Sequence, residues 1–105
     1  MVPYQQLLTA LSGHIGRDKG ITARRLCAHL DVTERQVRAL ISEARENGYG
    51  ICGKPRDGYF IADDADELEE TCQFLRGRAM HSLRLESLLR KIPLIELLGQ
   101  LRLPT

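Results

Sequence analysis

Residues 22–47 read TARRLCAHLDVTERQVRALISEAREN, and residues 48–62 continue as GYGICGKPRDGYFIA. In the first stretch, apolar residues repeat at helical spacing on both sides of Asp31, which tolerates the left-handed backbone of a sharp turn. Thr22 offers a hydroxyl as N-cap for the helix before this turn, and the inner face of that helix comprises Leu26, Cys27 and Leu30. Together the two stretches predict a helix, a tight turn, a second helix and a β-hairpin.

The helix after the turn carries the strongest local signals. Thr33 and Gln36 form a capping box, in which the threonine hydroxyl accepts from the Gln36 amide and the glutamine side chain returns to the Thr33 amide. Spacings of i, i+3, i+4 and i+7 predict one buried face made of Val37, Leu40, Ile41 and Ala44. Gly48 ends this helix, and the hairpin that follows has a turn containing Pro55 and Gly58.

Further helices are expected on both sides of this region. Residues 3–13 predict a first helix whose apolar face comprises Leu7, Leu8 and Leu11, and Ile21 predicts a brief strand. Residues 64–67 form another capping box, and the helix after it should run to about Lys91, with Gly77 as a weak point. We expect a mainly α chain with a small β-hairpin. Residues 1–62 should form the helix-turn-helix domain, and residues 63–105 a long helix with a short apolar tail helix.

Length and composition limit the class of protein. A chain of 105 residues with 43% hydrophobic residues supports one modest core. No apolar run approaches the ~20 residues needed to span a bilayer, and residues 1–13 do not resemble a signal peptide, so we expect a cytoplasmic protein without membrane contact. The three cysteines, Cys27, Cys52 and Cys72, are too isolated for a disulfide framework and are expected to be buried reduced thiols.

The net charge of +1 averages three unlike regions. Residues 17–58 hold nine Lys/Arg against six Asp/Glu, a net of +3, whereas residues 63–72 hold six acids and no base. Residues 76–102 hold six bases against two acids, a net of +4. The acidic run suits the positive end of a helix dipole, and the basic regions leave nucleic acid open as a partner.

Polar residues on the helix after the turn suggest what that partner is. Arg35, Arg38, Ser42 and Arg45 form a stripe away from the buried face. Arginine and glutamine pair with guanine and adenine edges, so we expect base contacts from Arg35, Gln36 and Arg38. Contacts to the DNA backbone are expected from Thr22, Arg24, Arg25, Thr33, Ser42, Arg45, Lys54 and Arg56. A solvated helix face would explain the stripe alone, but its combination with a basic hairpin favours double-stranded DNA.

The run LCAHLDVTERQVRALISEARENGYGICGKPRDGYFIA, residues 26–62, resembles a known family. It is similar to the winged helix-turn-helix domain at the N-terminus of the biotin-operon repressor and in DeoR-like regulators. In that family a Gly-Tyr pair begins each side of the wing, as in 48–49 and 58–59 here, but Cys27, Asp31 and Ala44 stand where alanine, glycine and leucine are common. The resemblance covers residues 5–62 and implies recognition through Thr33, Arg35, Gln36 and Arg38.

Two apolar stripes follow from residue 68 onward. The first, expected to close the core of the preceding domain, comprises Leu68, Cys72, Leu75, Ala79 and Leu83. The second stripe and the tail are expected to mediate oligomerisation through Phe74, Leu85, Leu88, Leu89, Ile92, Leu94, Ile95, Leu97, Leu98 and Leu101. A homodimer or higher homo-oligomer would set two recognition helices against the half-sites of a palindromic operator. The alternative is that the tail folds back on its own domain.

Enzymatic and metal sites are disfavoured. Residues 48–54 have the spacing of a phosphate-binding loop, but Pro55 stands where a Mg²⁺-binding hydroxyl is needed. Cys27 with His29, or Cys52 with Cys72, fits no common zinc spacing. We therefore expect no enzyme, cofactor or metal, and hypothesise a sequence-specific transcriptional regulator, of a kind found in bacteria or phages, acting as a homodimer. The alternatives are an adaptor that binds a protein partner, or an accessory DNA-binding factor in replication or recombination.

Overall fold

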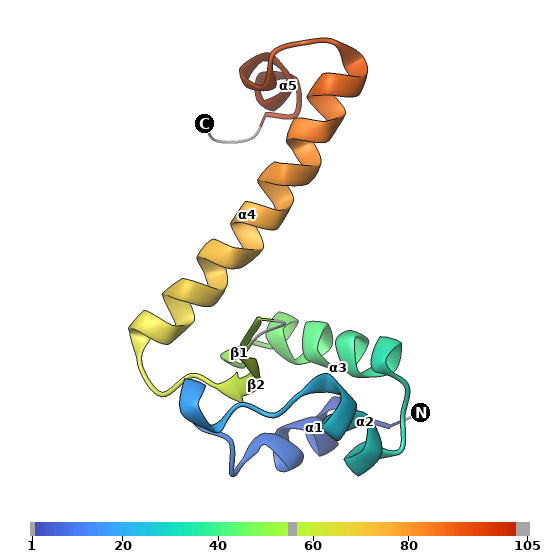
Figure 1. Cartoon of the computed structure of the whole chain (residues 1–105), viewed down its shortest axis with the longest axis vertical. Coiled ribbons are helices and arrows are strands. Elements are labelled where there is room, and N and C mark those ends of the chain that lie inside the picture. Colours follow the sequence, from blue (N-terminus) through green and yellow to red (C-terminus); the bar gives the residue numbers. More distant parts are fainter. Residues whose placement is uncertain (1, 55–56, 103–105) are drawn as a thin grey trace. The chain divides into compact units, whose positions relative to one another are not determined.

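The computed structural model describes residues 2–54 and 57–102. In chain order its elements are α1 (Tyr4–Leu11), the 3₁₀ helix η1 (Arg17–Lys19), α2 (Ala23–Leu30), α3 (Glu34–Glu46), β1 (Ile51–Lys54), β2 (Gly58–Ile61), α4 (Ala65–Arg90) and α5 (Leu94–Gln100) (Figure 1). The prediction of a mainly α fold is confirmed, with helix-turn-helix, small hairpin, long helix and short tail helix in the expected order.

The chain divides into two compact units, residues 1–71 and residues 72–105. We call them the N-terminal unit and the C-terminal unit. The division lies inside α4, beyond the boundary at residue 62 expected from the sequence. The first turns of α4 belong to the N-terminal unit because their acidic side chains bind its loops, as described below.

Three helix ends use the same backbone device. Asp31 after α2, Gly48 after α3 and Lys91 after α4 all have positive φ, and in each case the next amide reaches back to the last turn. Val32 N–H donates to Cys27 O at 3.1 Å, and Tyr49 N–H donates to Ala44 O at 3.1 Å. The left-handed residue turns the chain so that the following amide donates a hydrogen bond to a carbonyl of the last helical turn, which would otherwise lack a partner. The left-handed turn predicted at Asp31 is confirmed, with φ 55° and ψ 51°.

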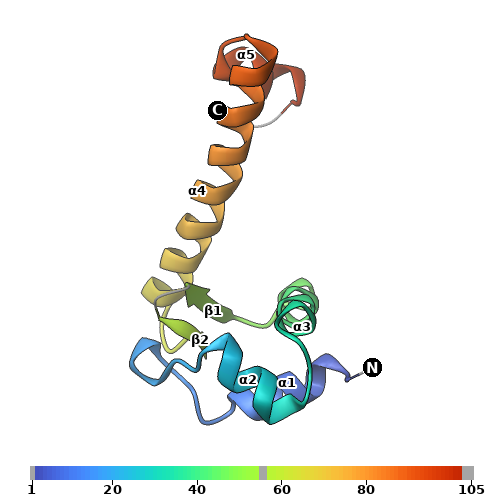
Figure 2. The same ribbon diagram turned by 45° about the vertical axis from the view of Figure 1, so that its right-hand side comes forward.

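The core of the N-terminal unit lies between α1, α2, α3 and the hairpin (Figure 2). Its buried members are Leu7, Leu11, Ile21, Leu26, Val37, Leu40, Ile41, Ala44 and Ile51. All four residues predicted for the inner face of α3 are among them. Cys27 and Leu30 are only half-buried, because α2 turns a narrower face to the core than its spacing suggested. Burial of these side chains supplies the main favourable free energy for folding of this unit.

The hairpin is antiparallel, with Ile51 opposite Ile61 and Cys52 opposite Phe60. Because side chains alternate across a strand, Ile51 joins the core while Cys52 and Phe60 are buried on the opposite face. Ile21 pairs with Tyr59 through one antiparallel bridge, which confirms the expected brief strand. Gly58 has φ 73° and lies against the Ile21 backbone, where a Cβ atom would collide, so this end of the hairpin requires glycine. Pro55 lies outside the described residues.

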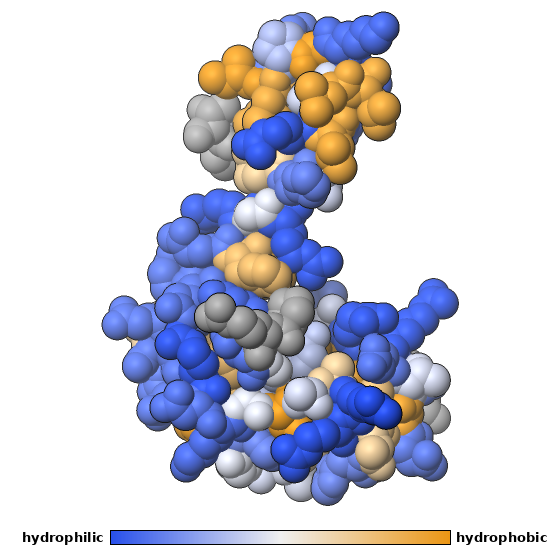
Figure 3. Space-filling view, viewed as in Figure 1, coloured by the Kyte–Doolittle hydropathy of each residue, from blue (hydrophilic) through white to orange (hydrophobic). Residues whose placement is uncertain are grey.

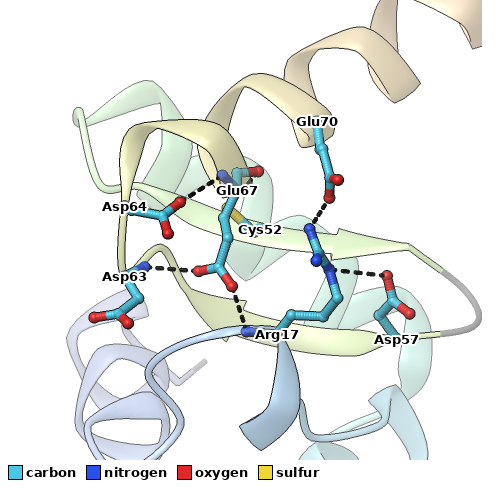
Figure 4. Close-up of polar contacts among 7 residues, drawn as sticks. All are labelled: Arg17, Cys52, Asp57, Asp63, Asp64, Glu67 and Glu70. Carbon is cyan, nitrogen blue, oxygen red and sulfur yellow. Dashed lines mark hydrogen bonds and ion pairs between the residues drawn. The ribbon is translucent and has the colours of Figure 1, made fainter.

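Arg17 holds the start of α4 to the rest of the N-terminal unit (Figure 4). Its guanidinium pairs with Glu70 and lies 4.0 Å from Asp57, and its backbone N–H donates to Glu67 at 2.8 Å. Asp64 caps α4 by accepting from the Glu67 amide, as predicted. The other half of the predicted capping box is different: the Glu67 carboxylate accepts from the Asp63 amide, one residue earlier, and from the Arg17 amide. The acidic run therefore binds a specific loop in addition to capping the helix.

The first apolar stripe predicted on α4 does not close the core. Leu68, Cys72, Leu75 and Ala79 are exposed, whereas Thr71 is the buried side chain of the first turns. The hairpin face near this part of α4 carries the buried Cys52 and Phe60, and the α4 backbone approaches it: Cys52 Sγ lies 3.6 Å from Glu67 O. The expectation of three buried thiols is likewise wrong for Cys72, which is exposed, and Cys27 is half-buried.

In the C-terminal unit, α5 packs against the end of α4. Lys91 has φ 58°, and the amides of Lys91 and Ile92 donate to Leu88 O and Ser87 O, which ends α4 before Pro93. Ser87, Leu97 and Leu98 are buried, so the tail folds back within its own unit. Figure 3 shows apolar side chains gathered over α5 and the end of α4. Gly77 does not interrupt α4, which is continuous from Ala65 to Arg90.

Candidate nucleic-acid interface

The exposed surface of α3 is positioned by its capping box. Thr33 Oγ accepts from the Gln36 amide at 3.1 Å, and Gln36 Oε1 accepts from the Thr33 amide at 2.8 Å. The buried face of α3 then turns Arg35, Arg38 and Ser42 to solvent. The Arg38 guanidinium has a weak contact of 4.0 Å with Glu34, and among the described residues Arg35 makes no side-chain hydrogen bond or ion pair. These two arginines are available to an external partner.

Three elements converge on a surface depression of about 250 Å³ beside α3. It is lined by Thr22 and Ala23 at the start of α2, Arg38 on α3, and Lys54, Gly58 and Tyr59 on the hairpin. Residues separated by more than thirty positions in the sequence therefore share one site. Its lining includes two cationic residues, Arg38 and Lys54, and two residues with hydroxyl groups, Thr22 and Tyr59, so the depression is suited to an anion such as a phosphate.

The hydroxyl groups of the N-cap residues Thr22 and Thr33 each keep a hydrogen that the cap does not use. Thr22 Oγ accepts from the Arg25 amide at 3.2 Å, as Thr33 Oγ does from Gln36. Each hydroxyl uses only an oxygen lone pair in the cap, so its proton remains free to donate to a phosphate oxygen. Arg24 and Arg25, on the first turn of α2, are exposed. Arg56, predicted for the tip of the hairpin, lies outside the described residues.

Gln36 and Arg45 have structural tasks that limit their expected roles. The Gln36 carbonyl is held toward the Thr33 amide by the cap, which restricts the orientation that two-point pairing with adenine requires. Arg45 Nε donates to Ile51 O at 2.8 Å, and the side chain is half-buried between α3 and β1. Sequence reasoning placed Arg45 in the exposed stripe because helical spacing does not show that the hairpin returns beside the last turn of α3.

The residues predicted for oligomerisation separate into three groups. Leu97 and Leu98 are buried inside the C-terminal unit, and Phe74, Ile92 and Leu94 are half-buried. The exposed group comprises Leu85, Leu88, Leu89, Ile95 and Leu101. Leu88, Leu89 and Ile95 are 67%, 84% and 70% exposed, which is unusual for aliphatic side chains of this size. These five residues are the apolar surface of the C-terminal unit.

Other kinds of site find little support in residues 2–54 and 57–102. Within these ranges no three His, Cys, Asp or Glu side chains are grouped as a metal site would require, and no helix is long and apolar enough to cross a membrane. Residues 48–54, with their phosphate-loop spacing, run into strand β1 and the hairpin rather than into a helix.

Comparison with known proteins brought no relative to light: no family model, no curated protein and no solved structure matches the chain.

Proposed function

We propose that this chain is a sequence-specific transcriptional regulator that binds double-stranded DNA as a homodimer. In this proposal α3 enters the major groove, and the start of α2 and the hairpin contact the phosphate backbone. The winged helix-turn-helix resemblance of residues 5–62 agrees with this role. The observation that carries the proposal is the depression in which Thr22, Arg38 and Lys54 meet beside the exposed Arg35.

The arrangement of charge supports DNA over a generic basic surface. Arg17, a base of the N-terminal unit, is withdrawn into contacts with Glu70 and Asp57. Arg38 on α3 and the half-buried Lys54 at the end of β1 line one depression, and α2 and α3 carry the further exposed bases Arg24, Arg25 and Arg35. A surface that only maintains solubility needs no such convergence, whereas a DNA backbone requires cations and hydroxyls at fixed relative positions.

The salt dependence of binding tests this function. We expect affinity for duplex DNA, measured by fluorescence anisotropy, to fall linearly with the logarithm of salt concentration, with a slope of about 0.9 for each phosphate neutralised. Lys54→Ala should weaken binding to all duplexes alike and reduce that slope by about 1. Lys19→Ala, which removes an exposed base from η1, is the matched control and should change the slope much less. Salt-independent binding, or equal effects of both variants, would contradict the proposed interface.

The homodimer is supported by the exposed residues Leu85, Leu88, Leu89, Ile95 and Leu101. Contact with a second copy would remove this apolar surface from water and supply the second recognition helix that a palindromic site needs. We expect sedimentation to give twice the chain mass of 11.9 kDa. Leu89→Glu should give the monomer mass with unchanged helix content. A monomer at all concentrations would remove the homodimer from the proposal without affecting the DNA-binding part.

The same apolar surface favours a second candidate, an adaptor that binds another protein. Salt separates the two functions, because an apolar protein interface changes little between low and moderate salt. An accessory role in replication or recombination shares the DNA interface and differs in the site that is bound. Footprinting on genomic fragments distinguishes it: protection at promoters supports regulation, and protection at an origin or attachment site supports the accessory role.

A further inference from the structure

The polar stripe of α3 is not one uniform surface. Arg45 donates a hydrogen bond to β1, and Arg38 lines the depression with Lys54 from the hairpin. Both arginines therefore lie on the flank of α3 that faces the hairpin. At about 100° per residue, Arg35 lies nearly opposite the buried Val37 and Leu40, with Ala39 and Ser42 next to it. Arg35 is therefore the long side chain at the centre of the exposed face, in the first turn of α3.

Gln36 is held beside Arg35 in one orientation. A backbone N–H at Thr33 requires an acceptor, so the amide oxygen of Gln36 must be the atom at 2.8 Å, and the NH₂ group takes no part in the cap. Apart from the Glu34 carboxylate, which lies 4.0 Å from Arg38, the first turns of α3 thus present donors: the guanidinium groups of Arg35 and Arg38 and the NH₂ group of Gln36. Guanine presents two acceptors in the major groove, the carbonyl oxygen O6 and the ring nitrogen N7, and these complement a pair of donors. Adenine presents one acceptor and one donor there.

We propose that α3 reads a guanine through Arg35, and that Gln36 is a positioning residue which maintains the start of the helix instead of reading adenine. In this proposal Arg38 and Lys54 together bind the adjacent phosphate. Arg38 therefore contributes little to the choice of base. The proposal rests on the proposed function, since it assumes that α3 lies in the major groove. It names the chemical class of the half-site: a guanine read on its O6 and N7 edge.

The test begins with selection of bound duplexes from a random pool, followed by anisotropy titration of the selected site with single modified bases. Replacing the contacted guanine by 7-deazaguanine removes N7, and we expect roughly a 5-fold or larger loss of affinity. Replacing it by inosine is the matched control, because inosine keeps O6 and N7 and lacks only the minor-groove amino group. That replacement should leave affinity within about twofold.

Two variants link the effect to the named residues. Arg35→Ala should lose roughly 5- to 150-fold on the selected site and should bind the guanine and 7-deazaguanine duplexes equally. Gln36→Glu keeps an oxygen acceptor for the cap, as a carboxylate in place of the amide, and removes the NH₂ group. It should lower affinity for all sequences alike, through its charge, and leave the selected consensus unchanged.

The outcomes separate the inference from the function on which it rests. A selected site without a guanine that responds to 7-deazaguanine overturns the guanine proposal while DNA binding stands. A consensus in which Gln36→Glu abolishes preference for an adenine also overturns it, because Gln36 would then be a reader. If no duplex is enriched and binding is independent of salt, the proposed function itself fails.

Discussion

Helices α3 and α4 differ in how their surroundings constrain them. Three local features define α3. The Thr33–Gln36 capping box begins the helix, four residues on one face are buried in the core, and Gly48 with φ 90° follows its end. In α4 the start is bound through carboxylates to Arg17, while Leu68, Leu75, Leu88 and Leu89 are exposed. A helix with one buried stripe is specified by its own spacing, whereas a long helix with several apolar stripes depends on which of them find partners.

The difference also separates the proposed tasks of the two units. The α3 helix is fixed in place by its four core residues, which suits a surface that must match a groove. The end of α4 and helix α5 present exposed aliphatic side chains. Such a surface suits association with another apolar surface.

Leu26→Ala should lower the free energy of unfolding by about 2–5 kcal/mol, because Leu26 is fully buried. Its truncation removes apolar contacts and creates a cavity. The measurement is denaturant unfolding followed by far-ultraviolet circular dichroism. Arg24→Ala, an exposed position of the same helix, is the control and should change stability by less than about 0.5 kcal/mol. Comparable effects from both variants would mean that α2 is not anchored through Leu26.

Leu97→Ala should cost about 2 kcal/mol, the lower end for a buried leucine, because the C-terminal unit has few side chains around it. Hydrogen exchange of the α5 amides is the appropriate measurement, since it reports local opening of this helix. Ile95→Ala removes an aliphatic side chain of similar size that is 70% exposed, and in the monomer it should leave exchange unchanged. If both variants accelerate exchange equally, α5 is not held by an inward face.

Thr33→Ala should destabilise the protein by about 1 kcal/mol, because the N-cap hydroxyl accepts from the Gln36 amide and alanine leaves that donor without its partner. Thr33→Ser keeps the hydroxyl and should be nearly neutral. Thermal unfolding of the three proteins compares them directly. Should serine prove as damaging as alanine, the methyl group and not the cap would be the stabilising part of this side chain.

Gly77→Ala should stabilise α4 by about 0.5–1 kcal/mol, because a Cβ atom there meets no atom within 4 Å and alanine loses less backbone entropy. Gly53→Ala is the opposite case, since its Cβ would collide with the Tyr59 ring. Urea midpoints of both variants give the comparison. Destabilisation by Gly77→Ala would show that a partner surface packs closely on α4 at this position.

Local signals in the sequence predicted much of the N-terminal unit and less of its candidate site. Thr22, Thr33 and Asp64 cap the helices as expected, and Asp31 adopts the predicted left-handed turn, because each needs only neighbours within a few residues. The convergence of Thr22, Arg38 and Lys54 was not visible, since three elements must fold before it exists. Arg45 was placed in the exposed stripe for the same reason, and the contacts of Arg17 with Glu67 and Glu70 were not predicted.

By itself the sequence determined the helices, their caps and the inner face of α3, because these follow from interactions between residues three to seven positions apart. Tertiary structure alone decided which cations remain free, where α4 is anchored and which leucines of the tail are buried. Those outcomes depend on contacts between distant segments, such as those in which Glu67 and Glu70 accept from Arg17. Spacing along one helix specifies a face, but only the packed neighbour decides whether that face is used for folding or remains available for binding.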